Sequence, residues 1–520
     1  MSALEIETAP RARLPRQIPF IIGNEGCERF SFYGMRNILT PFLVMSLLAY
    51  LPGEARAAEA KDVFHAFVIG VYFFPLLGGW LADRFLGKYR TVLWLSLVYC
   101  LGHACLAVFE HSVTGFYAGL ALIALGAGGI KPCVAAFVGD QFDESNRALA
   151  KVVFDAFYWI INVGSFLASL LMPFFLREYG AKVAFGLPGA LMFVATIVFW
   201  MGRKHYVMLP PTRHDPHGFA AVVKSALLAR APGRGGRPGL AVAWAAVALA
   251  VASLALMPSL GIVATLCVAL VLLLAGMVVG TRLQLERVRG VHPDEAIDGV
   301  GVVLRVLVVF ALVTPFWSLF DQKASTWVLQ ATAMQAPGWL HPAQMQAVNP
   351  ALVLLLIPFN NLVLYPLLRR LGFEPTALRR MTAGIAFSAV AWLVVGALQL
   401  ALDGGNPVHI AWQILPYVFL TMGEVLVSAT GLEFAYSQAP PAMKSTLMSF
   451  WTLSVTVGNL WVLLANAGVR NDTVLAGIAQ TGLGTTAFQM FFFAAFAGVA
   501  ALAFGLYARG YRTVDYYRST

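Results

Sequence analysis

Residues 113–139 read VTGFYAGLALIALGAGGIKPCVAAFVG, an apolar run that contains one charged residue, Lys131. About 20 apolar residues are enough for a helix to cross a hydrocarbon core of roughly 30 Å. Backbone groups in lipid must form their hydrogen bonds within the segment, which favours a helix. This stretch therefore predicts a transmembrane helix.

Similar apolar runs recur along nearly the whole chain. Six precede a polar, Pro/Gly/Arg-rich stretch at 210–239, two closely spaced runs follow it, and six more complete the sequence. This order predicts an all-α membrane protein with fourteen transmembrane helices, in which the middle pair is an inserted helical hairpin. The runs lie at 19–51, 62–82, 89–109, 113–139, 151–176, 184–203, 240–257, 259–281, 301–321, 348–370, 381–402, 409–437, 444–468 and 485–509.

The helix pattern also predicts the organisation of the chain. The two sets of six helices are expected to form two bundles, joined by linkers around the hairpin. The predicted parts are an N-terminal tail (1–18), a six-helix bundle (19–204), a linker (205–239), the hairpin (240–282), a second linker (283–300), a second six-helix bundle (301–509) and a C-terminal tail (510–520).

Composition agrees with a lipid environment. Of the 520 residues, 59% are hydrophobic and 12% are charged, whereas soluble proteins have about 25% charged residues. The net charge of +10 is spread through short loops, which argues against a nucleic-acid partner. The five cysteines lie in apolar segments without metal-ligand spacing, so we expect packing and neither metal nor cofactor. The first 19 residues contain no apolar core of a cleaved signal peptide.

The loop charges predict an orientation. Of 36 Lys and Arg residues, 26 fall in tails and loops that this helix order places on one face, five fall in the opposite loops, and five lie inside predicted helices. Positively charged loops stay in the cytoplasm. Both termini are therefore expected to be cytoplasmic.

Charged residues inside the predicted helices require partners or a wet cavity. One such charge costs roughly 2.5 to 3.5 kcal/mol on insertion scales. Five cations face five anions, which indicates a compensated polar interior of the kind that carries substrates or protons; the alternative is a purely structural ion-pair network. The residues are Arg29, Arg36, Lys131, Arg305 and Lys323, with Glu25, Glu28, Asp321, Glu424 and Glu433.

The first helix has the most polar face. At 100° per residue, Glu25, Arg29, Phe32 and Arg36 lie within about 60° of one another. Glu25 and Arg29 are four residues apart, a spacing that favours an ion pair. A proton that neutralised Glu25 would break this pair, and its release would restore it.

Lys131 and Glu424 are charged candidates on two other helices. Glycines and a proline around Lys131 are expected to free backbone carbonyls at a cavity. Its ammonium could bind a carboxylate or neutralise a titrating one. Glu424 could receive a substrate amine.

Polar and aromatic residues repeat with helical spacing elsewhere. Tyr158, Asn162 and Ser165 form one stripe, which could be substrate-binding or interhelical glue. Trp317 and Asp321 are four residues apart, and His65 and Tyr72 seven apart. These are either packing residues or parts of a pocket, and His65 could sense pH.

Several of these segments resemble the proton-dependent oligopeptide transporter (POT) family, bacterial type, of the major facilitator superfamily. Glu25, Glu28, Arg29, Phe30, Tyr33 and Gly34 match its ExxERFxYYG motif, and Phe32 stands for the first tyrosine. Residues 128–142, GGIKPCVAAFVGDQF, and 157–165, FYWIINVGS, are similar to its helix 4 and helix 5 signatures. Residues 79–88, GWLADRFLGK, resemble the superfamily's loop 2–3 motif.

The resemblance implies a major facilitator fold of two six-helix bundles around a central site, and the extra hairpin occurs in many bacterial members. It implies proton-coupled import of di- and tripeptides across the bacterial inner membrane, with peptide, proton and lipid as partners. The implied carboxylate site is Arg29, Arg36 and Lys131; the amine site is Asn162, Asn349 and Glu424; the side-chain pockets are Tyr33, Tyr72, Tyr158, Trp317, Ser428 and Trp451.

The resemblance also implies proton-coupling residues. Asp321 and Arg36, with His65 nearby, match the family's outer gate, and Lys131 with Glu424 would form a second bridge between the halves. The full coupling set is Glu25, Glu28, Arg29, Arg36, His65, Lys131, Asp321 and Glu424.

Other functions remain open at this level. Relatives of the family carry nitrate or other small solutes, although Glu424 suits a substrate with an amine better than a simple anion. A non-transporting membrane sensor is more remote, and no motif of an enzyme is present. The oligomeric state and the peptide preference stay open.

Overall fold

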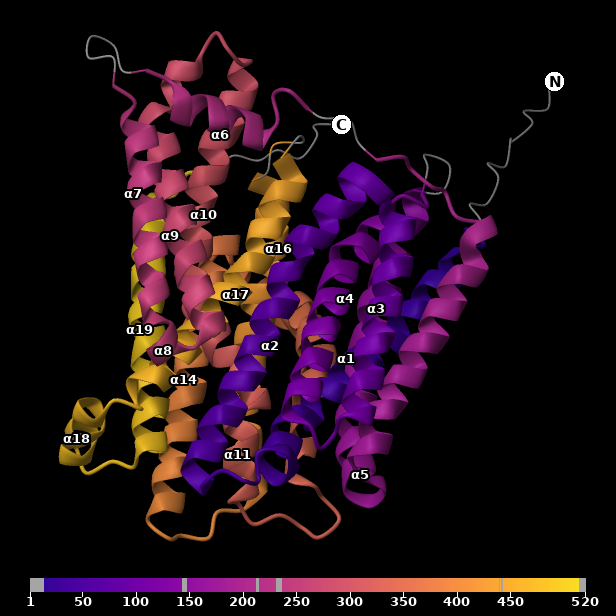
Figure 1. Cartoon of the computed structure of the whole chain (residues 1–520), viewed down its shortest axis with the longest axis vertical. Coiled ribbons are helices and arrows are strands. Elements are labelled where there is room, and N and C mark those ends of the chain that lie inside the picture. Colours follow the sequence, from indigo (N-terminus) through magenta and orange to yellow (C-terminus); the bar gives the residue numbers. More distant parts are fainter. Residues whose placement is uncertain are drawn as a thin grey trace.

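The computed structural model describes residues 14–142, 147–211, 215–230, 236–438, 440 and 443–513. Most of the predicted N-terminal and C-terminal tails, and short parts of the first linker, lie outside these residues. The described chain consists of helices and their connections (Figure 1).

The first half forms a bundle of long helices. They are α1 (Ile18–Phe42), α2 (Gly53–Leu81), α3 (Lys88–Val108), α4 (Val113–Gly139) and α5 (Arg147–Met201). α5 changes direction at Gly180, whose φ of 78° and ψ of 176° are not helical. A positive φ carries little cost for glycine, so the chain can turn here with no intervening loop. α5 therefore contains two helical segments, which correspond to the expected runs at 151–176 and 184–203.

A middle section follows. It contains α6 (Phe219–Leu228), α7 (Pro238–Ser253), α8 (Met257–Leu260) and α9 (Ile262–Gln284). α7 and α9 pack closely, since a Cβ on Gly276 would lie 2.1 Å from the Cβ of Ala246. The Gln284 side chain accepts from the backbone N–H of Gly239 at 2.6 Å and donates to the carbonyl of Ala226 at 2.9 Å, which ties α6, α7 and α9 together.

The second half is a bundle of more interrupted helices. π-helical turns separate α12 from α13 and α15 from α16. The helices are α10 (Asp294–Asp321), α11 (Thr326–Thr332), α12 (Val348–Phe359), α13 (Tyr365–Arg370), α14 (Ala377–Asp403), α15 (Ile414–Glu424), α16 (Thr430–Gln438), α17 (Lys444–Gly468), α18 (Asp472–Gln480) and α19 (Thr485–Gly510).

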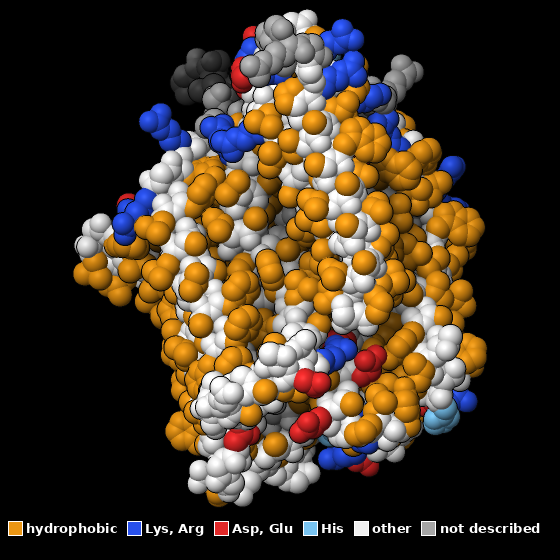
Figure 2. Space-filling view, turned by 60° about the vertical axis from the view of Figure 1, so that its left-hand side comes forward, with side chains coloured by type: hydrophobic (Ala, Val, Ile, Leu, Met, Phe, Trp, Pro, Cys, Tyr) orange, Lys and Arg blue, Asp and Glu red, His pale blue; other side chains and the backbone are white. Residues whose placement is uncertain are grey.

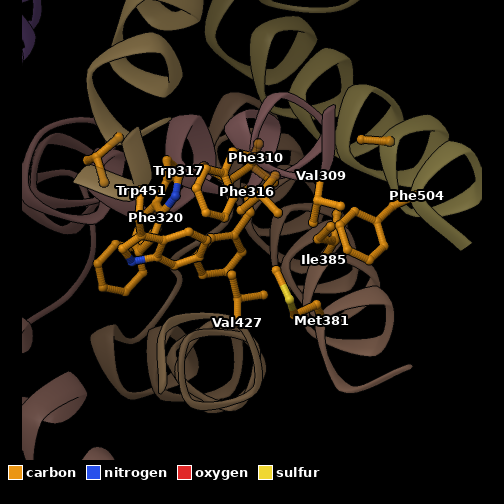
Figure 3. Close-up of a cluster of buried hydrophobic side chains, with 14 of the residues drawn as sticks. Val309, Phe310, Phe316, Trp317, Phe320, Met381, Ile385, Val427, Trp451 and Phe504 are labelled. Atoms are coloured by element: carbon orange, nitrogen blue, oxygen red, sulfur yellow. The ribbon is translucent and has the colours of Figure 1, made fainter. Parts of the chain in front are cut away.

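Each half has its own apolar core. One is built by α1 to α5, and the other by α10 to α19 with part of α6. Figure 3 shows part of the second core, where Phe310, Phe316, Trp317, Phe320 and Trp451 gather around facing helices. A smaller cluster joins α9 to α2 and α17. The middle section therefore packs where the two halves meet, against α2 of the first and α17 of the second.

Twelve helical segments of the described residues are long and apolar enough to cross a membrane. Figure 2 shows hydrophobic side chains covering the middle of the molecule, with Lys and Arg gathered at one end. α1 begins and α19 ends at this end, called the terminal face below, while α11 and α18 lie at the opposite face (Figure 1). The chain is thus an all-helical, multi-span membrane protein.

Two of the charges expected in the polar interior are exposed on the surface of the described structure. α10 begins at Asp294, earlier than the expected 301, so Arg305 lies near its terminal-face end and is exposed. Glu433 is also exposed and pairs with Arg380 at 3.3 Å. The prediction of five interior cations and five interior anions was wrong for these two residues, because the side of a helix that faces the bundle interior depends on tertiary packing.

The contact of α2 with α4 gives a first prediction. A Cβ on Gly78 would lie 2.2 Å from the carbonyl oxygen of Gly129. We expect Gly78→Ala to destabilise the protein by about 1 to 3 kcal/mol, because two backbones must separate. A Cβ on Gly79 meets nothing within 4 Å, so Gly79→Ala is the control. Equal thermal transitions of the two variants in detergent would contradict this prediction.

Candidate functional site

The charged groups of α1 form a buried cluster. Arg29 Nε lies 3.0 Å from Glu25 Oε1, and Arg29 also pairs with Glu28. All three side chains are at most 8% exposed. The Glu25–Arg29 pair predicted from helical spacing is confirmed. Such a carboxylate depends on its cation for stability away from water, so its protonation would change the cluster.

Lys131 projects from α4 toward aromatic rings. Its Nζ lies 4.3 Å from the ring centroid of Phe32 and 4.5 Å from that of Tyr72. Both distances are in the range of cation–π attraction. Phe32 stands where the family motif has a tyrosine, and its ring face still stabilises this ammonium. Lys131 is half-buried, so its charge remains accessible.

Glu424 ends α15, and a π-helical turn at Val425–Ala429 follows directly. The Asn349 Nδ2 donates to Glu424 Oε2 at 2.6 Å and to Thr421 Oγ1 at 3.0 Å. Lys323 Nζ donates to Asn349 Oδ1 at 2.8 Å. The Asn349 amide thus links the Lys323 ammonium to the Glu424 carboxylate. The π-helical turn after Glu424 is of a kind that is frequent at functional sites.

The expected bridge between Lys131 and Glu424 does not form in this structure. Among the ion pairs of the described residues, neither side chain takes part. Lys131 faces rings, while Lys323 approaches Glu424 through Asn349. The bridge stays a prediction for another conformation. Lys323 was not among the expected site residues, although its charge within an apolar run was a signal for it.

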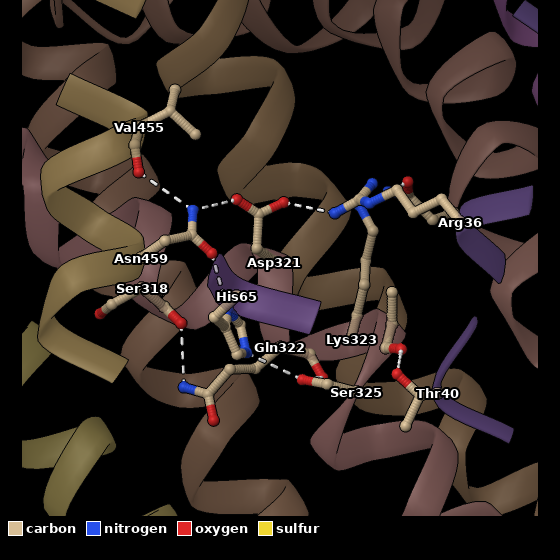
Figure 4. A network of polar contacts seen from close by, with 12 residues as sticks. Arg36, Thr40, His65, Ser318, Asp321, Gln322, Lys323, Ser325, Val455 and Asn459 are labelled. Carbon is tan, nitrogen blue, oxygen red and sulfur yellow. Dashed lines mark hydrogen bonds and ion pairs between the residues drawn. The ribbon is translucent and has the colours of Figure 1, made fainter. Parts of the chain in front are cut away.

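A buried network joins the two halves (Figure 4). Arg36 Nη2 of α1 lies 2.5 Å from Asp321 Oδ1 of α10. Asn459 Nδ2 of α17 donates to the other Asp321 oxygen at 2.8 Å, and Asn459 Oδ1 lies 2.6 Å from His65 Nδ1. His65 Nε2 lies 3.0 Å from Ser325 Oγ. These contacts place His65 and Asp321 in one network.

Asn459 and Ser325 in this network were not predicted. Both are uncharged residues within or beside apolar runs, where asparagine and serine commonly serve as interhelical glue. The sequence offers no signal that separates them from such residues.

Further contacts join the halves at the same level of the bundle. Thr40 donates to the carbonyl of Ala324 at 2.9 Å, and the Gln346 side chain donates to that of Asn37 at 2.9 Å. Arg470, beyond α17, pairs with Asp62 of α2. All of these residues lie in the half of the bundle away from the terminal face. The two halves are therefore closed together on that side.

Aromatic side chains form one wall of the interior. The rings of Trp317 and Trp451 are 5.8 Å apart, and Trp317 Nε1 donates to Ser454 Oγ at 3.1 Å (Figure 3). On α5, Asn162 donates to the carbonyl of Tyr158 at 3.0 Å. Trp317 and Trp451 thus belong to the second half, and Tyr158 and Asn162 to the first.

Exposure differs among the residues of the interior. Tyr158 is 47% exposed, and Tyr33, Tyr72, Glu424 and Ser428 are half-buried, as is Lys131. Arg36 and Asp321 are buried. These polar and aromatic residues are thus less enclosed than the Arg36–Asp321 pair.

A charged interior between two helical halves, closed on one side by a buried ion pair, is the architecture of a membrane transporter. A family model described as PTR2, "POT family", matches residues 89–474. The chain belongs to the POT family, as its sequence motifs predicted. The family consists of transporters and not of enzymes.

Solved structures and curated relatives agree. One match is the "Crystal structure of auto inhibited POT family peptide transporter", 69% identical with a TM-score of 0.95, covering 97% of this chain and 99% of that one. Another is an "In meso crystal structure of the POT family transporter PepTSo", 65% identical with a TM-score of 0.94, covering 96% and 98%. "Solute carrier family 15 member 2" of Rattus norvegicus is 33% identical over 80% of this chain and 54% of the relative. The chain thus spans about half the length of the curated relatives it matches.

Proposed function

We propose that this protein is a proton-coupled symporter that imports di- and tripeptides by alternating access. The observation that carries the proposal is the separation of opposite charges in the interior. Lys131 lies on the first half and Glu424 on the second, without an ion pair between them. A short peptide is a zwitterion, so its two ends match these charges.

The proposed contacts follow from this polarity. Arg29, Arg36 and Lys131 hold the peptide carboxylate, and Asn162, Asn349 and Glu424 hold the amino terminus. Aromatic walls tolerate many side chains because they supply apolar area without fixed hydrogen bonds. The proposed pocket residues are Tyr33, Tyr72, Tyr158, Trp317, Ser428 and Trp451.

The proposed coupling uses the buried network and the α1 cluster. A proton on Asp321 would weaken its ion pair with Arg36 and release the face opposite the termini. Glu25, Glu28 and His65 are further proton sites. A proton moving inward gains about 2.3 kcal/mol per 100 mV of membrane potential, which supports uptake against a gradient.

We further propose fourteen transmembrane helices, the middle pair being an inserted hairpin. The twelve apolar segments leave out α1, whose charges lower its hydropathy, and treat the two segments of α5 around Gly180 as one. The gathering of Lys and Arg at the terminal face supports a cytoplasmic location of both termini. A bacterial inner membrane is the proposed location.

Liposomes that contain a pH-sensitive dye test the function. Under an inside-negative potassium diffusion potential, we expect dialanine to acidify the lumen of liposomes with the wild-type protein. Lys131→Ala is expected to lose about tenfold or more of this signal, the loss for one missing ionic contact. Lys224→Ala, a change of an exposed lysine on α6, is the matched control.

Substrate comparison separates the alternatives. Acidification by nitrate and not by dialanine would replace the peptide assignment with an anion carrier. A flat signal with di- and tripeptides, from protein that is folded by thermal unfolding, would contradict the proposal.

A further inference from the structure

Polar residues of α1 and α3 meet inside the first bundle. Ser31 Oγ lies 3.3 Å from His103 Nε2, and Ser31 also donates to the carbonyl of Pro188. Tyr99, one turn before His103, stacks on its ring at 5.0 Å. Because Ser31 lies beside His103, the residues one turn earlier on each helix, Glu28 and Tyr99, lie at the same level. The two helices therefore run in the same direction with matched registers.

The next turn continues this arrangement. By the same register, the residues one turn nearer the terminal face on α1 and α3 are Asn24 and Ser96. We call the resulting set of residues the α1–α3 seam, which consists of Asn24, Glu28, Ser31, Ser96, Tyr99 and His103. Every one of these side chains is at most 1% exposed.

The seam contains polar atoms without partners. Asn24 Oδ1, Ser96 Oγ and both Glu28 oxygens have no hydrogen bond of good geometry among the described residues, and the Tyr99 hydroxyl lies near Ser31 without the geometry of a hydrogen bond. Within the described part of the chain, the one ion pair of Glu28 is with the adjacent Arg29. An unpaired buried polar group costs roughly 1 to 3 kcal/mol. Internal water commonly supplies such groups with about three hydrogen bonds each.

Several charged or titratable groups face the seam. Glu25, Arg29 and Tyr33 of α1 and Lys131 of α4 interact electrostatically with Glu28, and Arg29 interacts with Tyr99 in the same way. On α3, His103 and Cys100 are the titratable neighbours of Tyr99. The second segment of α5 contributes the uncharged carbonyl of Pro188, which accepts the hydrogen bond from Ser31. Glu28 is thus the carboxylate at the centre of the seam.

We propose that the α1–α3 seam is a binding site for internal water that exchanges the proton of Glu28 through the Tyr99 hydroxyl. A hydronium ion beside the Tyr99 hydroxyl gives a proton to the phenol oxygen and becomes water, while the phenol passes its own proton through a bridging water to the Glu28 carboxylate. One proton moves and the tyrosine is unchanged. The reverse sequence releases it. This inference rests on the proposed proton-coupled transport and adds a route that bypasses the peptide site.

Two transport modes test the seam. Peptide exchange between equal pools requires no net proton movement, whereas accumulation driven by a proton gradient does. We expect Tyr99→Phe, which removes one oxygen, to exchange dialanine within about twofold of the wild type. Its proton-driven accumulation should fall about tenfold, the factor that one hydrogen bond to a charged group represents.

Tyr417→Phe is the matched control. Tyr417 is also fully buried, packs on Trp327 in the second bundle and, among the described residues, interacts with no charged group. We expect this control to accumulate dialanine as the wild type does. Glu28→Gln and the Glu28→Gln/Tyr99→Phe double variant should be equally uncoupled, because both changes interrupt one path.

The outcomes are distinct. Wild-type accumulation by Tyr99→Phe, or an additive loss in the double variant, would overturn the seam proposal and leave the proposed function standing. If the wild-type protein moves no protons, both the seam proposal and the proposed function would be contradicted. If Tyr99→Phe does not fold, Ser96→Ala, which removes another unpaired hydroxyl, is held to the same criteria.

Discussion

Asp321→Asn is expected to abolish proton-driven uptake of dialanine while leaving exchange between equal pools measurable. The change removes the anionic partner of Arg36, which is buried and 2.5 Å away. Breaking one side of a buried ion pair costs about 3 to 5 kcal/mol. The conformation closed opposite the termini should lose about that much stability, a shift of two or more powers of ten toward the state open on that face.

Spin-label distances between α2 and α17 near the face opposite the termini would report this opening. Asp298→Asn is the control, because Asp298 makes an exposed pair with Arg289 at 2.8 Å, and such pairs contribute about 0 to 1 kcal/mol. Adding Arg36→Gln to Asp321→Asn should restore part of the closure, since the unpaired charge is removed. Unchanged distances and full proton-driven uptake in Asp321→Asn would contradict the role of this ion pair.

Glu424→Gln is expected to abolish selection for a free amino terminus. For the wild type, we expect dialanine to bind at least about 100-fold more tightly than N-acetyl-dialanine, since a site built around a charged partner strongly rejects an analogue without it. In Glu424→Gln the ratio should fall to about tenfold or less, because the amide loses the charge but keeps its hydrogen bonds. Titration calorimetry of the two peptides measures the ratio.

Glu433→Gln is the matched control for this experiment. Glu433 is one helix further along the chain, exposed, and paired with Arg380, so its removal should leave the ratio unchanged. Equal losses of affinity for both peptides in Glu424→Gln would place Glu424 outside amine recognition. It would then have a general role in stability or coupling.

The first helix shows what local spacing can predict. Glu25 and Arg29 form their expected pair because an α-helix fixes residues four apart on one face, whatever surrounds it. The polar character of α1 follows from the same geometry. The same holds for the apolar segments, since chain length and hydropathy suffice to identify a helix that can cross a bilayer.

Partners across helices were less predictable. Asp321 has two partners, Arg36 and Asn459, that are distant in sequence and come from different helices. The motif resemblance suggested Arg36 as a partner, although helical periodicity did not. No feature of the sequence suggested Asn459. The sequence identified Lys323 as an interior charge. Its contact with Asn349 could not be predicted, because it depends on how α11 and α12 pack against α10.

By itself the sequence determined that this protein is an all-helical membrane transporter of the POT family, and where its interior charges lie along the helices. Hydropathy, helical spacing and motifs are local properties of the sequence, so they can be identified without the tertiary structure. The tertiary structure decided which charges meet, why Lys131 faces rings instead of Glu424, and which side of the bundle is closed. Those properties depend on the packing of distant helices, because an ion pair requires two side chains within a few ångströms, and sequence separation does not specify that distance.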